Sequence, residues 1–314
     1  MRIRLIEIVG CLACVALLVM PAPKAHAEDV HLYFIGGQSN GTGRADASVI
    51  PSASPLASPQ TDVSLYYRKT RPGATNNVLA EDTIINLAPG SGYGEGGTVY
   101  PVEFGPELGI GRTLADALPG QNILLVKGTR GGSNLHSNWA VGGGDYTTFL
   151  DIAGDAIDAV IANGDNPVLM GMFWVQGESD TGNTTNASNY GANLTDLISR
   201  VRTDLFGGSE APFVLSQLSD NQYNSLTAGL QLVRQGQSSV NANVANTAMV
   251  TTDDDLLYTV GAGADQIHFD TNGQINLGNA LGAELVSLVP EPNSLALLAL
   301  SGLMMIKRRR RDTY

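Results

Sequence analysis

A serine in a glycine-rich turn is the first residue of the chain whose setting suggests chemistry. Ser39 follows the apolar run at residues 30–35, within the sequence GGQSN at residues 36–40. A serine hydroxyl is a weak nucleophile unless the fold exposes it and a neighbouring base removes its proton. The same turn is also typical of an ordinary strand-to-helix connection, in which Ser39 or Asn40 caps the helix. The turn alone leaves both interpretations open.

An acid and a base near the other end of the chain are the partners that a nucleophilic serine needs. Asp265 and His268 are three residues apart, in the sequence DQIHF at residues 265–269. At this spacing in a turn, an aspartate can accept a hydrogen bond from the imidazole ring and leave the other ring nitrogen facing the serine. The alternative is a buried structural histidine, because His268 has apolar neighbours on both sides.

Two further positions are candidates for binding the negative charge that develops on an ester oxygen. Gly105 stands at a predicted helix start (FGPE, residues 104–107), where backbone N–H groups have no partner within the helix. The side-chain amide of Gln176 (WVQGESD, residues 174–180) can donate to an oxyanion. Glu178 in the same block can hold neighbouring loops by hydrogen bonds. A helix-start glycine and polar loop residues are the alternatives.

Alternating strands and helices are predicted around these positions. Apolar runs predict strands at residues 30–35, 123–126, 168–175, 213–218 and 248–251, and amphipathic patterns predict helices at 106–118, 149–161, 194–205 and 275–288. Strands separated by such helices form a parallel sheet covered on both faces. We therefore expect the α/β fold class, as a three-layer α/β/α sandwich with a flavodoxin-like parallel sheet. Its ligand should lie at the carboxyl ends of the strands, where these candidate residues fall.

One segment does not follow this alternation. Residues 41–104 are rich in Gly, Pro, Ser, Thr and Asn, with short apolar pieces at 63–67 and 83–87. We expect a loop-rich insertion that overhangs the site and shapes substrate entry.

The sequence does not support a metal or cofactor site. A G-x-G-x-x-G pattern at residues 92–97 is followed by TVYP, where a dinucleotide site needs a helix. The histidines His31, His136 and His268 are far apart and lack metal-ligand spacing. We expect no metal ion and no organic cofactor.

The first 27 residues resemble a secretory signal. Arg2 and Arg4 precede an apolar run at residues 8–20, and AHA at 25–27 is a small-x-small cleavage site. Both cysteines of the chain lie inside this segment. The mature protein should therefore have no disulfide and no thiolate metal ligand.

The last segment, residues 289–314, resembles a second targeting signal. It begins with VPEP at 289–292, continues with an apolar run at 295–306 and ends in KRRRR at 307–311. The run is shorter than the roughly 20 residues of a comfortable membrane span. The combination resembles the bacterial PEP-CTERM sorting signal, which implies export and processing by an exosortase-type enzyme. A permanent C-terminal anchor is the alternative, and we expect membrane association only through this segment.

The charge of the remaining chain excludes some partners. Residues 28–289 hold 10 Lys and Arg against 27 Asp and Glu, a formal charge of −17. Such a surface repels nucleic acid and anionic lipid, so we expect neither as a partner. Neutral glycans carry no such penalty.

Five blocks of the chain resemble one family of esterases. They are GQSN at residues 37–40, FGPE at 104–107, KGTRGGS at 127–133, WVQGESD at 174–180 and DQIHF at 265–269. Together they resemble SGNH-type hydrolases, specifically carbohydrate esterase family 6 and its sialate O-acetylesterase-like branch. The resemblance covers about residues 30–288.

The resemblance implies a role for each candidate. Ser39 would be the nucleophile, His268 the base and Asp265 the acid that orients the imidazole. The oxyanion hole would combine the backbone N–H groups of Ser39 and Gly105 with the side-chain amide of Gln176. The supporting residues would be Gln38, Asn40 and Glu178. Broader relatives have asparagine in place of Gln176. Glu178 competes with Asp265 as the acidic partner of the histidine.

These observations favour an exported serine esterase that removes O-acetyl groups from carbohydrate, with Arg130 and Trp139 contacting the sugar. Two alternatives stay open. One is a non-catalytic glycan-binding or matrix protein on the same fold, and the other is an esterase for short non-sugar acyl esters. We place the esterase domain at residues 28–288.

Overall fold

The computed structural model describes residues 26–68, 79–92, 102–220, 227–253 and 267–289. The predicted signal segment falls almost wholly outside these ranges, as does the predicted sorting segment. Asp265 also lies outside the described residues. Within the described ranges, no helix is long and apolar enough to cross a membrane.

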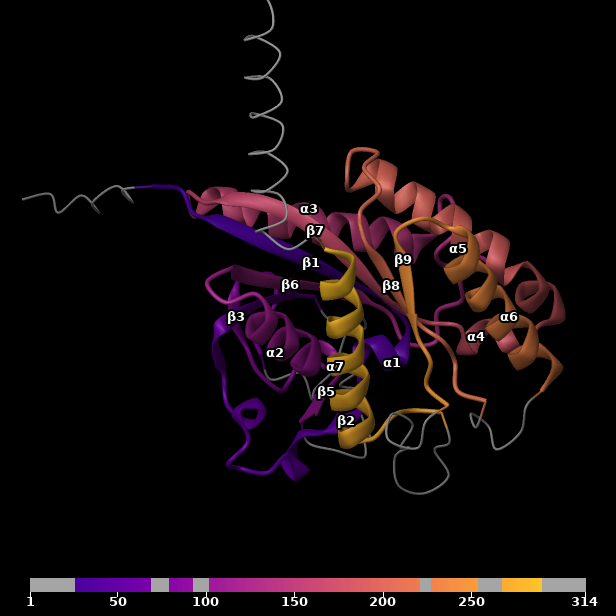
Figure 1. Cartoon of the computed structure of the whole chain (residues 1–314), viewed down its shortest axis with the longest axis horizontal. Coiled ribbons are helices and arrows are strands. Elements are labelled where there is room, and N and C mark those ends of the chain that lie inside the picture. Colours follow the sequence, from indigo (N-terminus) through magenta and orange to yellow (C-terminus); the bar gives the residue numbers. More distant parts are fainter. Residues whose placement is uncertain (1–25, 69–78, 93–101, 221–226, 254–266, 290–314) are drawn as a thin grey trace, which may run out of the picture.

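A seven-stranded sheet forms the centre of the protein (Figure 1). Its order is β4 (Ile85–Leu87), β3 (Gln60–Tyr67), β6 (Asn122–Thr129), β1 (Asp29–Gly37), β7 (Asn166–Val175), β8 (Phe213–Ser216) and β9 (Thr247–Val250). The edge strand β4 is antiparallel to β3, and the other neighbouring strands pair in parallel. The predicted parallel α/β sheet is confirmed, with one antiparallel edge.

Helices cover both faces of this sheet. One face packs against α3 (Gly144–Ala162), α5 (Thr184–Asp204) and α6 (Ala228–Asn243), and the other against α2 (Glu107–Ala117) and α7 (Thr271–Leu288). The central strand β1 contributes side chains to the hydrophobic cores on both faces of the sheet, because successive side chains of a strand point to opposite faces. Leu32 and Phe34 enter the first core, whereas Tyr33 and Ile35 enter the second. The three-layer sandwich is confirmed.

Segment 41–104 contributes more to the sheet than a loop-rich insertion would. Its strand β3 pairs in parallel with β6, from Val63 opposite Ile123 to Tyr67 opposite Lys127. The same segment also provides β4, two short 3₁₀ turns and β2 (Ala45–Asp46), which pairs with β5 (Glu103–Phe104). The apolar piece at residues 63–67 is therefore a sheet strand and carries part of the core.

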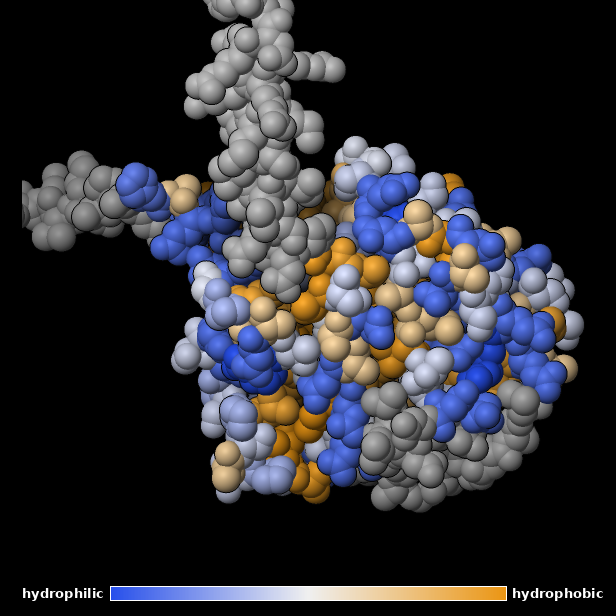
Figure 2. Space-filling model, in the orientation of Figure 1, coloured by the Kyte–Doolittle hydropathy of each residue, from blue (hydrophilic) through white to orange (hydrophobic). Residues whose placement is uncertain are grey.

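Helix α6 was not predicted from the sequence, because a buried polar residue interrupts its apolar stripe. Leu230, Val233, Gln237 and Val240 are its buried residues, so a glutamine interrupts the apolar stripe. The surface around α5 and α6 is mainly hydrophilic, whereas hydrophobic residues reach the surface beside α7 (Figure 2). The partly buried apolar residues of α7 include Ile275, Val286 and Leu288.

Candidate active site

The structure brings Ser39 and His268 together across 229 positions of the sequence. The Nε2 atom of His268 lies 2.9 Å from the Oγ atom of Ser39. Ser39 opens the single-turn helix α1 (Ser39–Thr42) directly after β1. His268 lies two residues before the capping residue Asp270, whose side chain accepts from the N–H of Gly273 at the start of α7. This pair has the geometry of a nucleophile and its base.

A glycine makes the sharp turn before the serine possible. Gly37 has a φ of +138°, a conformation that residues with a side chain rarely adopt. A Cβ atom there would also overlap the carbonyl oxygen of Val175 in the neighbouring strand β7. The strand edge therefore requires glycine immediately before Gln38 and Ser39.

Asn40 connects the serine turn to both the histidine segment and the Gln-Gly-Glu block. Its Nδ2 donates to Oε1 of Glu178 at 2.5 Å and to the carbonyl of Ile267 at 3.0 Å. Its Oδ1 accepts from the N–H of Phe269 at 3.2 Å. Asn40 thus holds the backbone on both sides of His268, and Glu178 is bound to the residue that follows Ser39.

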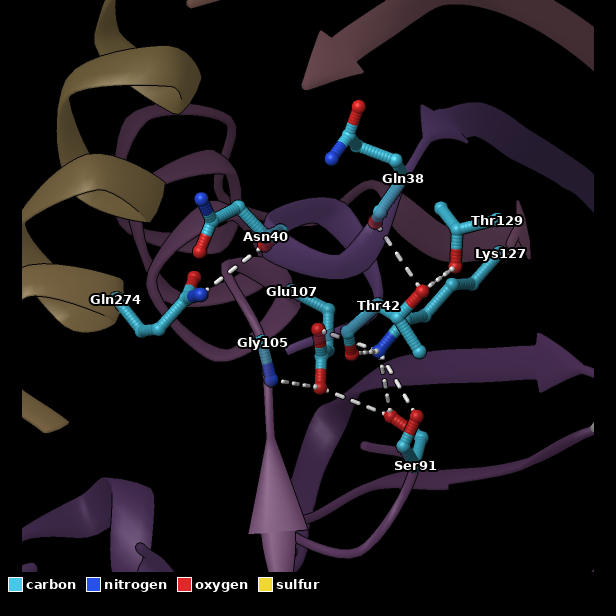
Figure 3. A network of polar contacts seen from close by, with 9 residues as sticks. All are labelled: Gln38, Asn40, Thr42, Ser91, Gly105, Glu107, Lys127, Thr129 and Gln274. Atoms are coloured by element: carbon cyan, nitrogen blue, oxygen red, sulfur yellow. Dashed lines mark hydrogen bonds and ion pairs between the residues drawn. The ribbon is translucent and has the colours of Figure 1, made fainter. Parts of the chain in front are cut away.

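Buried side chains from distant elements donate hydrogen bonds to backbone carbonyl groups of α1 (Figure 3). Lys127 of β6 donates from Nζ to the carbonyl of Thr42 at 2.6 Å, and Gln274 of α7 donates to the carbonyl of Asn40 at 3.0 Å. Lys127 also forms a buried ion pair with Glu107, with Nζ 2.9 Å from Oε2. Burial lowers the pKa of the Lys127 amine, although the Glu107 carboxylate opposes this shift. The sequence signal for this contact was a lysine at the end of an apolar strand, which needs a carboxylate partner.

Gly105 does not present its N–H in the way that the oxyanion prediction requires. The N–H donates to Oε1 of Glu107 at 2.9 Å, and Ser91 donates to the same oxygen at 2.8 Å (Figure 3). Glu107 is fully buried, so its carboxylate binds the nearby donors. The Gly105 amide therefore stabilises the Glu107–Lys127 pair in this structure.

Gln176 likewise uses its side-chain amide inside the protein. The side chain is fully buried, and Nε2 lies 2.7 Å from Oδ2 of Asp180, 3.1 Å from Oε1 of Gln38 and 3.2 Å from the carbonyl of Ser133. Its Oε1 accepts from the hydroxyl of Tyr190 at 3.0 Å. An amide nitrogen has two N–H groups, and internal acceptors already surround it. This arrangement differs from the predicted oxyanion donor and makes Gln176 the centre of a structural network.

Asp180 is a site-supporting residue that the sequence analysis did not single out. Its carboxylate accepts from the backbone N–H groups of Leu135 at 2.8 Å and His136 at 3.2 Å, and from Gln176. Burial raises its pKa, and these hydrogen bonds partly oppose the shift. Asp180 thereby ties the loop after β6 to the Gln-Gly-Glu block.

The two predicted sugar-contacting residues have different surroundings. Arg130 donates its backbone N–H to the carbonyl of Gly37 at 3.0 Å, and its side chain is 53% exposed. Trp139 is only 1% exposed, and its ring lies edge-on against Trp174 with centroids 4.8 Å apart. Its indole N–H donates to Ser133 at 2.9 Å. Trp139 is therefore a core residue, and its burial leaves little surface for the predicted contact with sugar.

Metal ligation is not a feature of the described residues. In those ranges, no group of three His, Cys, Asp or Glu side chains is arranged to hold a metal ion. The chemistry that the site offers is a serine hydroxyl bound to an imidazole, at the carboxyl edge of a mostly parallel sheet. This combination is that of a serine hydrolase.

The family of the chain follows from comparison with known proteins. Residues 29–287 match the family described as carbohydrate esterase, sialic acid-specific acetylesterase. The chain belongs to this family, and the protein is therefore a carbohydrate esterase. No curated protein matches the chain.

Several solved structures share the fold. A protein from Arabidopsis thaliana is 20% identical with a TM-score of 0.62, covering 82% of this chain and 98% of that chain. NanS is 16% identical with a TM-score of 0.61, covering 83% and 97%. A carbohydrate acetylesterase from Xanthomonas citri is 17% identical with a TM-score of 0.52, covering 81% of this chain and 55% of its own. At these identities the similarity shows a common fold.

Proposed function

We propose that the protein removes O-acetyl groups from carbohydrate through an acetyl-serine intermediate. The observation that carries this proposal is the 2.9 Å distance between Ser39 Oγ and His268 Nε2. Membership of a carbohydrate esterase family supports the substrate class and favours catalysis over a purely glycan-binding role.

The proposed reaction has two stages. As Ser39 Oγ attacks the carbonyl carbon of the acetyl ester, His268 Nε2 accepts the hydroxyl proton. His268 then returns this proton to the sugar oxygen as the C–O bond of the ester breaks. In the second stage, His268 accepts a proton from a water molecule as that water attacks the acetyl carbon. The bond from this carbon to Ser39 Oγ then breaks, His268 returns the proton to Ser39 Oγ, and acetate leaves. Asp265 keeps its predicted role as the residue that orients the imidazole.

The Ser39 N–H is the donor that best fits the oxyanion. It lies at the start of α1, where the first helical N–H groups have no partner within the helix, and it donates to no acceptor within the described ranges. Gly105 and Gln176 bind other acceptors, so their predicted part in the oxyanion hole lacks support from the geometry.

Hydrolysis of nitrophenyl acetate by purified protein tests the catalytic pair. Ser39→Ala and His268→Ala should each lower kcat by at least roughly 10³-fold. His136→Ala is the matched control, since its side chain is exposed, and it should keep the parent rate. Parent-like rates in both Ser39→Ala and His268→Ala would show that the pair is not catalytic.

Acyl-chain length separates the remaining alternative. A carbohydrate deacetylase should prefer acetyl over octanoyl esters and should release acetate from acetylated glycans. Hydrolysis of short-chain nitrophenyl esters with no acetate release from glycans would instead support an esterase for short non-sugar acyl esters, and a preference for octanoyl esters would also remove the carbohydrate assignment.

We also propose that the protein is exported and processed at both ends. The support is the resemblance of residues 1–27 to a secretory signal and of residues 289–314 to a PEP-CTERM signal. Mass spectrometry of protein from the cell surface or medium should show a chain that begins at Glu28 and lacks the arginine cluster at residues 308–311. Recovery of the full chain from the cytoplasm alone would refute export.

A further inference from the structure

The helix α1, which carries Ser39, is a single turn of four residues. The hydrogen bonds that close this turn run from the N–H of Thr42 to the carbonyl of Gln38 at 2.8 Å, and from the N–H of Gly43 to the carbonyl of Ser39 at 2.7 Å. A single turn is not stable on its own, because its formation fixes several residues for each hydrogen bond gained. The direction of the Ser39 hydroxyl therefore depends on contacts that other elements make with α1.

Strand β6 provides two side chains that contact the end of this turn. Lys127 and Thr129 are two residues apart on β6, so their side chains point to the same face of the sheet. Lys127 Nζ donates to the carbonyl of Thr42 at 2.6 Å, and Thr129 Oγ1 lies 2.9 Å from Thr42 Oγ1. Both side chains are buried. Because β6 pairs with β1 on one side and β3 on the other, these contacts fix α1 relative to the centre of the sheet.

Lys127 also connects α1 to two further segments. Its Nζ atom lies 2.9 Å from the carbonyl oxygen of Ser91 and 2.9 Å from Oε2 of Glu107 (Figure 3). An ammonium group has three N–H donors, and the carbonyl of Thr42 is the third acceptor. The other two acceptors hold the ammonium group in place, so it presents a fixed donor to Thr42.

The backbone that follows α1 is in direct contact with Gly105. A Cβ atom on Gly43 would lie 2.1 Å from the Cα atom of Gly105, so the two backbones touch without an intervening side chain. The N–H of Gly105 donates to Oε1 of Glu107 at 2.9 Å. Glu107 thus binds both the ammonium group of Lys127 and the backbone against which the end of α1 packs.

We propose that Lys127 is a positioning residue for catalysis. Its ammonium group holds the carbonyl of Thr42 and thereby directs the Ser39 hydroxyl toward His268. The residue acts through the backbone of α1, and a displacement of about 1 Å at a catalytic group can cost about 10²-fold in rate. The inference rests on the proposed function and adds a residue to the machinery of that site.

A double variant separates positioning from stability. Lys127→Met combined with Glu107→Gln removes both buried charges, so the folded protein should keep much of its stability. It also removes the donor to Thr42, so kcat for nitrophenyl acetate should fall roughly 10- to 100-fold, with KM changed far less. Urea denaturation and kinetics are measured on the same samples. A purely structural lysine predicts that kcat recovers together with stability, and a parent-like kcat in the double variant would overturn the proposal.

Glu107→Gln alone assigns the effect to the lysine. This variant keeps the contact between Lys127 and Thr42, so its kcat should stay at least roughly tenfold above that of the double variant. Equal losses of kcat in the two variants would assign the effect to Glu107 and overturn the role of Lys127. Arg112→Met, which breaks surface ion pairs of α2, is the control and should keep the parent kcat.

Labelling of Ser39 by a nitrophenyl phosphonate separates this inference from the proposed function, because it reports the reactivity of the serine without turnover of an acetyl ester. The labelling rate of the double variant should be at least roughly tenfold below that of the parent, under conditions in which both are folded. A parent that is labelled but hydrolyses no acetyl ester would contradict only the proposed function. Parent-like labelling of the double variant would contradict only the positioning role. A parent that is neither active nor labelled would overturn both.

Discussion

The side-chain amide of Asn40 lies 2.5 Å from the carboxylate of Glu178 and joins the serine turn to the block after β7. Its other contacts reach the backbone at Ile267 and Phe269, on either side of His268. One asparagine therefore sets the position of the His268 segment relative to the Ser39 turn, although it contacts neither Ser39 Oγ nor His268 Nε2.

Replacing Asn40 should reduce catalysis more than binding. Asn40→Ala removes the contacts that hold the backbone around His268, and small displacements of a catalytic group cost up to about 10²-fold in rate. We expect kcat for nitrophenyl acetate to fall roughly 10- to 100-fold, with KM changed far less. Asn189→Ala, at an exposed position of α5, is the control. A parent-like kcat in folded Asn40→Ala would contradict the positioning role.

Breaking the buried ion pair should destabilise the fold. Lys127→Met leaves the Glu107 carboxylate buried without its cation, which typically costs about 3–5 kcal/mol. Lys127→Met combined with Glu107→Gln removes both charges and should recover much of this loss. Urea denaturation measures these free energies of unfolding. Arg112→Met, which breaks surface ion pairs with Asp62 and Asp116, should cost less than about 1 kcal/mol.

The same lysine should make stability depend on pH in the alkaline range. Burial lowers its pKa below the ordinary value of 10.5 in the folded protein. Between the lowered value and 10.5, the unfolded chain keeps a proton on Lys127 that the folded chain has lost. The contribution of Lys127 to the free energy of unfolding therefore rises with pH across this window. Parent protein and the Lys127→Met/Glu107→Gln variant, compared by denaturation from pH 7 to 10, should show the rise only in the parent.

Replacing Gln176 should distinguish a structural amide from an oxyanion donor. Loss of an oxyanion donor costs about 10²- to 10³-fold in kcat. Because Gln176 binds Gln38, Ser133 and Asp180, we expect Gln176→Ala mainly to lower the denaturation midpoint. Its kcat should stay within roughly tenfold of the parent at temperatures where the variant is folded. A loss of 10²-fold or more with unchanged stability would restore the oxyanion role.

The central strands and the proximity of Ser39 to His268 were predicted correctly from the sequence, because the residue types form patterns with a direct physical explanation. Buried parallel strands are continuous apolar runs, so β1 and β7 were predicted from composition alone. Ser39 follows such a run, and His268 precedes the predicted helix at residues 275–288. The parallel topology then brings both residues to the same edge of the sheet. Strand β3 was missed because polar residues dominate its first half, and only its pairing with β6 reveals it.

The hydrogen-bond partners of the site were less predictable. Gly105 and Gln176 stand at strand ends as expected, but the direction of an N–H group depends on which buried acceptors compete for it. Glu107 and Asp180 are those acceptors, and no local pattern shows that both are buried. The sequence therefore identifies which residue types lie at a site, but it does not show which hydrogen bonds these residues form in the folded protein.

The serine turn is completed by elements from both ends of the domain, and this has a consequence for folding. Gln274 of the last helix binds the carbonyl of Asn40 across 234 positions of the chain. Contacts of such separation form slowly, because long loops must close before they are made. We therefore expect the turn that contains Ser39 to become fully ordered only after α7 has docked. Esterase activity thus reports complete folding, and a chain truncated before α7 should be inert even though Ser39 and His268 are both present.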